Sequence, residues 1–292
     1  PDGGLELRVG VHSHGQGMET TLAQVAHEVL GVDVAHVQLI HGDTALTPYS
    51  TGTWGSRCAV MAGGAVADAC TALRERLLRM GAHLLQADPA AARFEAGAVH
   101  AGGGSIRVAE IARAFFRAPQ TLPEAMQAEG LDVTIGHKTV RDTGTFSYAC
   151  HGVEAEVDVA TGHVTLLRYV IVEDGGTLLN PLIADGQVLG GTAQGIGTAL
   201  YEEMPYDGSG QPLASTLADY LLPGAGEVPD IEILHMETPS PISRFGQKGI
   251  GESGAIGPPA AIVNAINDAI AHLGREVTDL PATPERILAA LA

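Results

Sequence analysis

The chain has 292 residues, of which 34 are acidic and 16 basic, so its formal net charge is −18 at neutral pH. A surface this negative repels nucleic acids and anionic membranes, so we expect neither as a partner. Three widely spaced cysteines, Cys58, Cys70 and Cys150, argue against a disulfide scaffold and against an iron–sulfur site held by this chain, and they favour the reducing cytoplasm.

The first half of the sequence predicts short strands that alternate with helices. The expected elements are strands at 5–12 and 36–43 and helices at 19–31, 59–86 and 108–116. Gly31 follows the last apolar position of the first helix, where a glycine commonly ends a helix. Short strands and Pro/Gly breaks fill residues 88–145, so we expect a boundary between two subdomains, 1–140 and 141–292.

The second half predicts a hairpin, two helices and a further strand. The hairpin is "SYACHGVEAEVDVATGHVTLLRYVIVEDGG", with an Ala-Thr-Gly turn. Five glycines in "ADGQVLGGTAQGIGTALYEE" predict a helix that packs closely against a neighbour, and "PDIEILHMET" predicts a strand. Helix 258–273 starts at two prolines, and its inward residues are Ile262, Ala265, Ile266, Ala269, Ile270 and Leu273. The fold class is therefore α+β, with mixed sheets and packed helices.

Glycine-rich segments precede or begin several of these helices. They are "SHGQGMETT", "GTWGSRCAV", "GQKGIGESGAIGPP" and "GGTAQGIG". A helix start carries unpaired N–H groups and a partial positive charge, so it binds phosphate well. Each segment alone favours the simpler interpretation, in which glycine caps and packs the helix. Together they favour a large polyanionic cofactor held by the backbone.

The common phosphate and nucleophile motifs do not fit. There is no G-x-x-x-x-G-K-[ST] loop, and the glycines at 190–197 lack the setting of a dinucleotide fingerprint. "GESGA" differs from the nucleophile elbow of serine hydrolases in its last residue. His12 and His14 are a possible metal pair, but two histidines alone make a poor site and structural histidines are commoner.

Five segments, in order along the chain, resemble one family. They are "SHGQGMETTLAQVAHEVLG", "HGDTALTPYSTGTWGSR", "DGQVLGGTAQGIGTALYEE", "DYLLPGAGEVPDIEILHMETPSP" and "GQKGIGESGAIGPPAAIVNAINDAI". Together they resemble the C-terminal half of the molybdenum hydroxylase large subunit, the family of xanthine dehydrogenase, aldehyde oxidase and aerobic carbon monoxide dehydrogenase. The resemblance implies a molybdopterin cofactor with molybdenum, in bacteria usually as the cytosine dinucleotide, and two molybdopterin-binding subdomains.

The resemblance also implies which residues touch the cofactor. Those carried over are Gly15, Gln16, Gly17, Glu19, Thr20, Ser56, Arg57, Cys58, Gln194, Lys248, Gly249, Ile250 and Gly251. Arg57 would supply a cation, although its alternative is a surface ion pair worth little. Cys58 is more often a small buried apolar residue than a ligand.

Glu252, in "KGIGESG", falls on the catalytic base of the family. The resemblance implies hydroxylation of an electron-poor carbon in an N-heterocycle of the purine or nicotinate type, with water as the oxygen source. The alternatives are oxidation of an aldehyde or of carbon monoxide by the same family, and a non-catalytic module that carries molybdopterin. Without the flanking motifs, a solvated loop carboxylate would be the better interpretation of Glu252.

The resemblance implies partners as well. Family large subunits have an N-terminal half that this sequence does not contain, so we expect a split enzyme with a second molybdopterin-binding chain, or else a fragment. An iron–sulfur subunit with [2Fe–2S] centres and a flavin subunit with FAD would carry electrons away. The substrate would be a small molecule.

Overall fold

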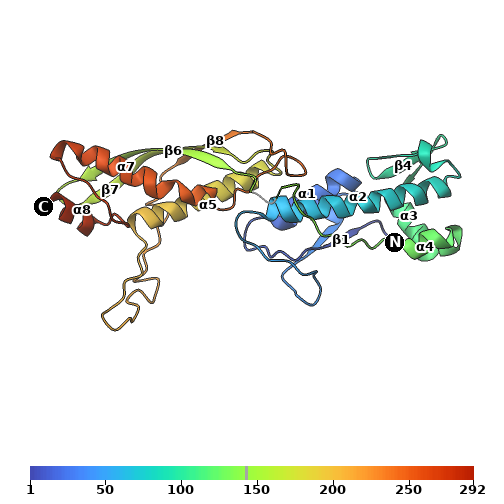
Figure 1. Ribbon diagram of the computed structural model, residues 1–292, viewed down its shortest axis with the longest axis horizontal. Helices are drawn as coiled ribbons and strands as arrows, with labels where there is room; N and C mark the ends of the chain where they lie inside the picture. The colour runs from blue at the N-terminus through green and yellow to red at the C-terminus, as the bar shows by residue number, and fades with distance from the viewer. Residues whose placement is uncertain (142–143) are drawn as a thin grey trace. The chain divides into compact units, whose positions relative to one another are not determined.

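The computed structural model describes residues 1–141 and 144–292, and it divides into two compact units. The first unit contains Pro1–Gly144 and Pro241–Gln247, and the second contains Thr145–Ser240 and Lys248–Ala292. Helices and strands occur in both units (Figure 1), which confirms the predicted α+β class. None of the described helices combines the length and the apolar character that crossing a bilayer requires.

The first unit is built around the long helix α2. Its elements are β1 Leu5–Arg8, α1 Met18–Leu30, β2 Val37–Ile40, α2 Cys58–Leu84, β3 Arg93–Glu95, β4 Ala98–Ala101, β5 Gly104–Arg107, α3 Val108–Arg117 and α4 Glu124–Glu129. Strands β1 and β2 pair in parallel, and β3, β4 and β5 form an antiparallel meander. Both helix α1 and strand β4 pack against α2. The helices expected at 19–31, 59–86 and 108–116 are thus confirmed, with ends shifted by a residue or two.

The short segment 241–247 belongs to the first unit because its side chains bind α2. Gln247 donates from Nε2 to the carbonyl oxygen of Ala59 over 3.0 Å. The guanidinium of Arg244 lies 3.7 Å from the carboxylate of Asp68 and donates to the hydroxyl of Thr71. A few polar contacts therefore place these seven residues with a part of the chain far from them in sequence.

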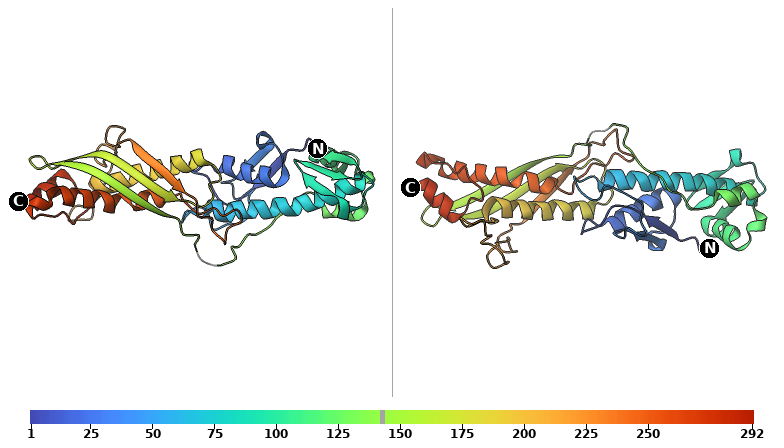
Figure 2. Two further views of the ribbon diagram at one scale, coloured as in Figure 1. Left: turned by 90° about the horizontal axis from the view of Figure 1, so that it is seen from above. Right: turned by 60° about the horizontal axis from the view of Figure 1, so that its bottom comes forward.

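The second unit is a sheet with helices along one face (Figure 2). Its elements are β6 Tyr148–Asp158, β7 His163–Asp174, α5 Pro181–Leu200, β8 Ile231–Met236, α6 Ser253–Ile256, α7 Pro258–Ile270 and α8 Pro284–Leu291. Strands β6 and β7 are antiparallel, as predicted, and Gly162 in their turn has φ +74°. Strand β8 pairs in parallel with β7. The carboxyl ends of β7 and β8 therefore lie together.

The core of the second unit lies between the sheet and α7. Ile262, Ile266 and Ile270 are fully buried against Tyr169 and Ile171 of β7, and burying each such side chain contributes about 1.5–3 kcal/mol. The inward face predicted for this helix is confirmed at these isoleucines. It is wrong at Leu273, which is 46% exposed, because the last turn is a 3₁₀ helix that ends at Gly274 and rotates this side chain off the face.

The segment "GGTAQGIG" was expected to begin a helix, and this expectation is wrong. Helix α5 begins at Pro181, where the side chain of Asn180 caps the amide of Ile183. The glycines lie inside the helix and let it approach α6 and α7. A Cβ on Gly195 would come 2.6 Å from Cγ of Pro258. The predicted close packing through small residues is confirmed.

This packing gives a matched pair of substitutions in one helix. Gly195→Ala should lower the free energy of unfolding by about 1–3 kcal/mol, because the added methyl group overlaps the rigid ring of Pro258. Gly190→Ala should raise it by about 0.5–1 kcal/mol, because nothing lies within 4 Å and alanine favours the helix. Urea unfolding of the full chain measures both. Shifts in the same direction would contradict the packing described for α5.

Candidate functional site

The turn between β1 and α1 carries two glycines in left-handed conformations. Gly15 has φ +114° and Gly17 has φ +68°, values that residues with side chains rarely adopt. A Cβ on Gly15 would meet nothing within 4 Å, so its backbone is open. No side chain caps α1, although the amide of Thr20 binds the carbonyl oxygen of Gly17 over 3.2 Å. The amides of Met18 and Glu19 thus begin the helix without a side-chain cap.

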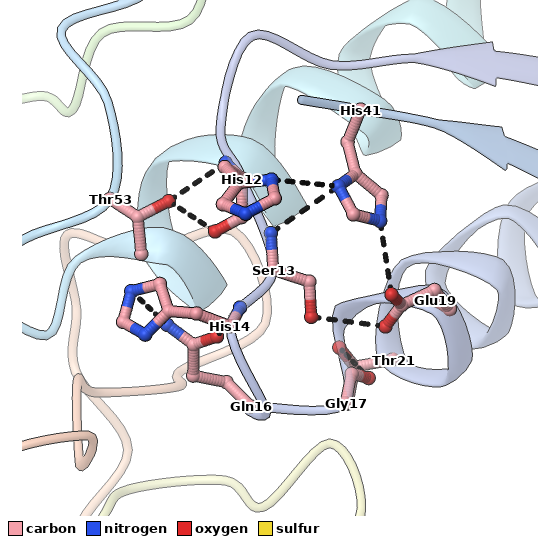
Figure 3. A network of polar contacts seen from close by, with 9 residues as sticks. All are labelled: His12, Ser13, His14, Gln16, Gly17, Glu19, Thr21, His41 and Thr53. Carbon is pink, nitrogen blue, oxygen red and sulfur yellow. Dashed lines mark hydrogen bonds and ion pairs between the residues drawn. The ribbon is translucent and has the colours of Figure 1, made fainter. Parts of the chain in front are cut away.

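A network of hydrogen bonds stabilises this turn (Figure 3). The carboxylate of Glu19 accepts from the hydroxyl of Ser13 over 3.1 Å and lies 3.0 Å from Nε2 of His41. A hydrogen bond to its own backbone amide lowers the pKa of Glu19, and these two partners lower it further against the opposing effect of burial. Thr53 holds both the amide and the carbonyl of His12. Glu19 is therefore an ionised brace of the turn.

Gln16 also shapes its own turn. Its Oε1 accepts from the amide of His14 over 2.7 Å, and its Nε2 lies 3.1 Å from Nε2 of the same histidine. Nδ1 of His12 lies 3.4 Å from Nδ1 of His41. Within residues 1–141 and 144–292, no group of three or more metal-ligating side chains is assembled. The histidines of this turn are thus tied into hydrogen bonds with one another and with the chain.

The second turn precedes α2 and folds around Arg57. Its guanidinium lies 4.5 Å from the centre of the Trp54 ring and donates to the carbonyl of Gly52 and the hydroxyl of Thr51. Ser56 adopts φ +54°, uncommon for a residue with a side chain.

Cys58 is the first residue of α2 and is half-buried. Burial raises the pKa of its thiol, although Thr53 and Arg57 act in the opposite direction. A thiol in this state is a poor nucleophile or metal ligand at neutral pH.

The loop 248–252 lies in the second unit and starts from a buried ion pair. Nζ of Lys248 lies 3.0 Å from Oδ1 of Asp174, and the two side chains are 5% and 0% exposed. The amide of Lys248 also donates to the carbonyl of Gly175 over 2.8 Å. Burial acts to raise the pKa of Asp174, but hydrogen bonds from Thr238, Gly176 and Lys248 outweigh it and hold this pKa below its usual range. The first residue of the loop is therefore fixed to the end of β7.

The following residues lead outward to Glu252. Ile250 is half-buried and packs where Gly175 leaves room, because a Cβ there would lie 2.8 Å from Cγ2 of Ile250. Gly249 is half-buried, whereas Gly251 and Glu252 are exposed, and α6 begins immediately afterwards. Glu252 thus stands at the outer point of a loop whose start is buried.

Ser253 fixes the other end of this loop. Its hydroxyl oxygen lies 2.5 Å from Oε1 of Glu173 and 2.9 Å from the carbonyl oxygen of Ile250. A hydroxyl tied to a carboxyl group and a carbonyl is not prepared for attack on a substrate, which speaks against the serine-hydrolase interpretation of "GESGA".

The structure gathers the expected residues into separate groups. Gly15 to Thr20 form one turn and Ser56 to Cys58 a second, both in the first unit, whereas Lys248 to Glu252 form a loop of the second unit. Gln194 is exposed on α5 in the second unit, where its carbonyl accepts from the hydroxyl of Thr198.

Sequence reasoning missed Glu173 and Asp174, which anchor the loop from the end of β7. A signal was present, because "VIVED" places two acids directly after apolar strand residues. Both carboxyl groups are buried. Their burial depends on contacts with Ser253 and Lys248, which are distant in sequence, so the sequence pattern could not reveal it.

Comparison with known proteins defines the class of this chain. A family model described as a molybdopterin cofactor-binding domain matches residues 1–229. The chain belongs to this family, which confirms the resemblance to the large subunits of molybdenum hydroxylases.

Particular relatives are similar over nearly the whole chain. The nicotine 6-hydroxylase large subunit of Paenarthrobacter nicotinovorans is 38% identical over 291 residues, covering 99% of this chain and 35% of that protein. The carbon monoxide dehydrogenase large chain of Hydrogenophaga pseudoflava is 33% identical, covering 98% of this chain and 35% of that protein. Quinoline 2-oxidoreductase from Pseudomonas putida 86 superposes with a TM-score of 0.86 at 41% identity, covering 96% of this chain and 36% of that chain. The chain thus spans about a third of the length of these relatives.

Proposed function

We propose that the chain forms part of a molybdenum hydroxylase that inserts oxygen from water into an electron-poor carbon of an N-heterocycle. Glu252 is the general base. The observation that carries this proposal is the placement of Glu252, an exposed carboxylate in a loop whose flanking residues are held by buried contacts. A general base must reach the substrate and keep a fixed position, and this loop provides both.

The residues present suit an anionic cofactor. Helices α1 and α2 begin without side-chain caps after glycine turns, and a Cβ would meet nothing within 4 Å at Gly15, Gly52 and Gly55, so the backbone there is open. Such amides bind phosphate without an added cation. When bound, molybdenum supplies a two-electron acceptor and the means to use water as oxygen donor. The residues that would hold the cofactor are Gly15, Gln16, Gly17, Glu19, Thr20, Ser56, Arg57, Cys58, Gln194 and Lys248–Gly251.

Within this set the structure suggests different tasks. Because the side chain of Gln16 is engaged inside its own turn and that of Glu19 binds Ser13 and His41, they would shape the turn while backbone amides bind the cofactor. Arg57 would lend a positive charge from a guanidinium already held by its turn. Glu252 would take the proton from water as oxygen is transferred, and pass it to solvent because the side chain is exposed.

The cofactor is the cytosine dinucleotide form of molybdopterin, and electrons leave through partner chains. We propose a second molybdopterin-binding chain, an iron–sulfur subunit with [2Fe–2S] centres and a flavin subunit with FAD. The names of the relatives support an assembly, since they include a large subunit of nicotine 6-hydroxylase and a gamma subunit of a 6-hydroxypseudooxynicotine dehydrogenase complex. Three free thiols at Cys58, Cys70 and Cys150 fit the cytoplasm as the compartment.

An N-heterocycle is favoured over carbon monoxide or an aldehyde. By their names the relatives at 38% and 41% identity act on nicotine and quinoline, both aromatic N-heterocycles. One observation favours the alternative, since a carbon monoxide dehydrogenase superposes with a TM-score of 0.88, though at 30% identity.

Co-expression with the neighbouring subunits tests the proposal. The purified complex should contain molybdenum and release cytidine monophosphate in equal amounts on acid hydrolysis. It should reduce a dye with N-heterocycles and not with aldehydes or carbon monoxide. Cells grown without molybdate supply the control. An assembled complex that lacks molybdenum despite ample molybdate, or that oxidises only carbon monoxide, would overturn the assignment.

A further inference from the structure

The hydroxyl of Ser253 lies within hydrogen-bond distance of two oxygen atoms. Its Oγ lies 2.5 Å from Oε1 of Glu173 and 2.9 Å from the carbonyl oxygen of Ile250. A serine hydroxyl has one hydrogen to donate and two lone pairs to accept with. If Glu173 were ionised, both neighbouring oxygens would compete for this hydrogen. If Glu173 carries a proton, it donates to Ser253, and Ser253 donates to Ile250.

The surroundings of Glu173 disfavour a negative charge. The residue is 1% exposed, and its Oε2 has no hydrogen-bond partner among the described residues. It continues the core face of β7, two residues beyond Ile171. The next residue, Asp174, is already a buried anion, and its Oδ1 is bound to Lys248. Burying an unpaired carboxylate in such a place is strongly unfavourable, so a neutral carboxyl group is favoured.

We infer that Glu173 is a protonated carboxyl group at neutral pH and that, through Ser253, it is a positioning residue for the general base Glu252. The inference rests on the proposed function for the role of Glu252. The proton on Glu173 completes a chain of hydrogen bonds from Glu173 to Ser253 to the carbonyl of Ile250. Because Ile250 and Ser253 flank residues 251 and 252, these hydrogen bonds hold the two ends of the loop that carries Glu252 together.

The charged and titratable groups around Glu173 come from three other elements and from its own strand. Asp174 follows it on β7, Lys248 lies at the start of the loop, and His235 is its register partner on β8. His235 is in turn bound through Nε2 to Asp185 of α5 over 2.7 Å. Burial raises the pKa of Glu173, and the negative charge of Asp174 raises it further, whereas Ser253 and His235 act to lower it. The raising effects prevail.

Infrared spectroscopy of the full chain tests the protonation state without any turnover. At neutral pH the spectrum should contain the carbonyl stretch of a protonated carboxyl group, and this band should disappear in Glu173→Gln. Glu232→Gln is the matched control, because Glu232 lies exposed on the neighbouring strand β8 and pairs with Arg168. A spectrum without the band, or a band that survives Glu173→Gln, would overturn the inference while leaving the proposed function intact.

Activity of the assembled complex tests the positioning role. Glu173→Gln carries an amide that can donate to Ser253, so kcat should stay within about threefold of the parent. Glu173→Ala removes the donor and should lower kcat on the order of 10²-fold, as a small displacement of a catalytic group does, with KM nearly unchanged. Amide exchange of residues 248–254 should quicken in Glu173→Ala and not in Glu173→Gln. Equal losses in the two variants, or full activity in Glu173→Ala, would overturn the positioning role.

Discussion

Replacing Glu252 with glutamine should lower kcat on the order of 10²–10⁴-fold, the range that a positioned general base contributes. Glutamine has nearly the same shape, but its amide cannot take up a proton at neutral pH. The side chain is exposed at the outer point of its loop, so the change should leave folding and the content of molybdenum and nucleotide unaltered. Steady-state kinetics of the assembled complex, normalised to bound molybdenum, provide the measurement.

Glu237→Gln serves as the control for this variant. Glu237 is another exposed glutamate of the second unit, just after β8, and it lies outside the loop. Its variant should keep the kcat of the parent. Full turnover by Glu252→Gln with molybdenum bound would contradict the role of Glu252 as base. That result would favour the alternative in which this chain only carries the cofactor and supplies no catalytic base.

Much of the fold could be predicted from local patterns. The helix at Met18–Leu30 follows from apolar spacing and from Gly31, which ends it in a left-handed conformation. The hairpin of β6 and β7 follows from alternation and a turn containing Gly162. These features depend on residues close in sequence, so one sequence is enough to find them.

Features that depend on distant contacts could not be predicted. The glycines of α5 look alike in sequence, yet Gly195 meets Pro258 whereas Gly190 meets nothing within 4 Å. The resemblance implies that Lys248 touches the cofactor, but no local pattern indicated that its side chain is buried against Asp174, 74 residues earlier. In both cases, packing against parts of the chain that are distant in sequence determines the surroundings of the residue.

The ion pair between Lys248 and Asp174 provides the largest expected effect on stability. Lys248→Met keeps the length of the side chain but leaves the buried carboxylate of Asp174 without its cation. Removing one partner of a buried pair costs about 3–5 kcal/mol, so the second unit should unfold at a lower urea concentration. Hydrogen exchange of peptides from β7, followed along a urea series, measures the stability of this unit directly.

The dependence on pH separates this electrostatic effect from a loss of packing. The folded pKa of Asp174 lies below the unfolded value of about 3.9. Its stabilising contribution is therefore present above that pH and is lost only as the pH falls toward the folded pKa. Without Lys248, burial should raise the folded pKa above the unfolded one. The deficit of Lys248→Met should thus already be present near about pH 4, where the parent keeps the contribution of Asp174, and should grow further toward about pH 8 as the buried Asp174 of the variant is forced to ionise. Adding Asp174→Asn should remove this pH dependence, because no buried charge remains, and a deficit that stayed constant with pH in Lys248→Met would assign the loss to packing alone.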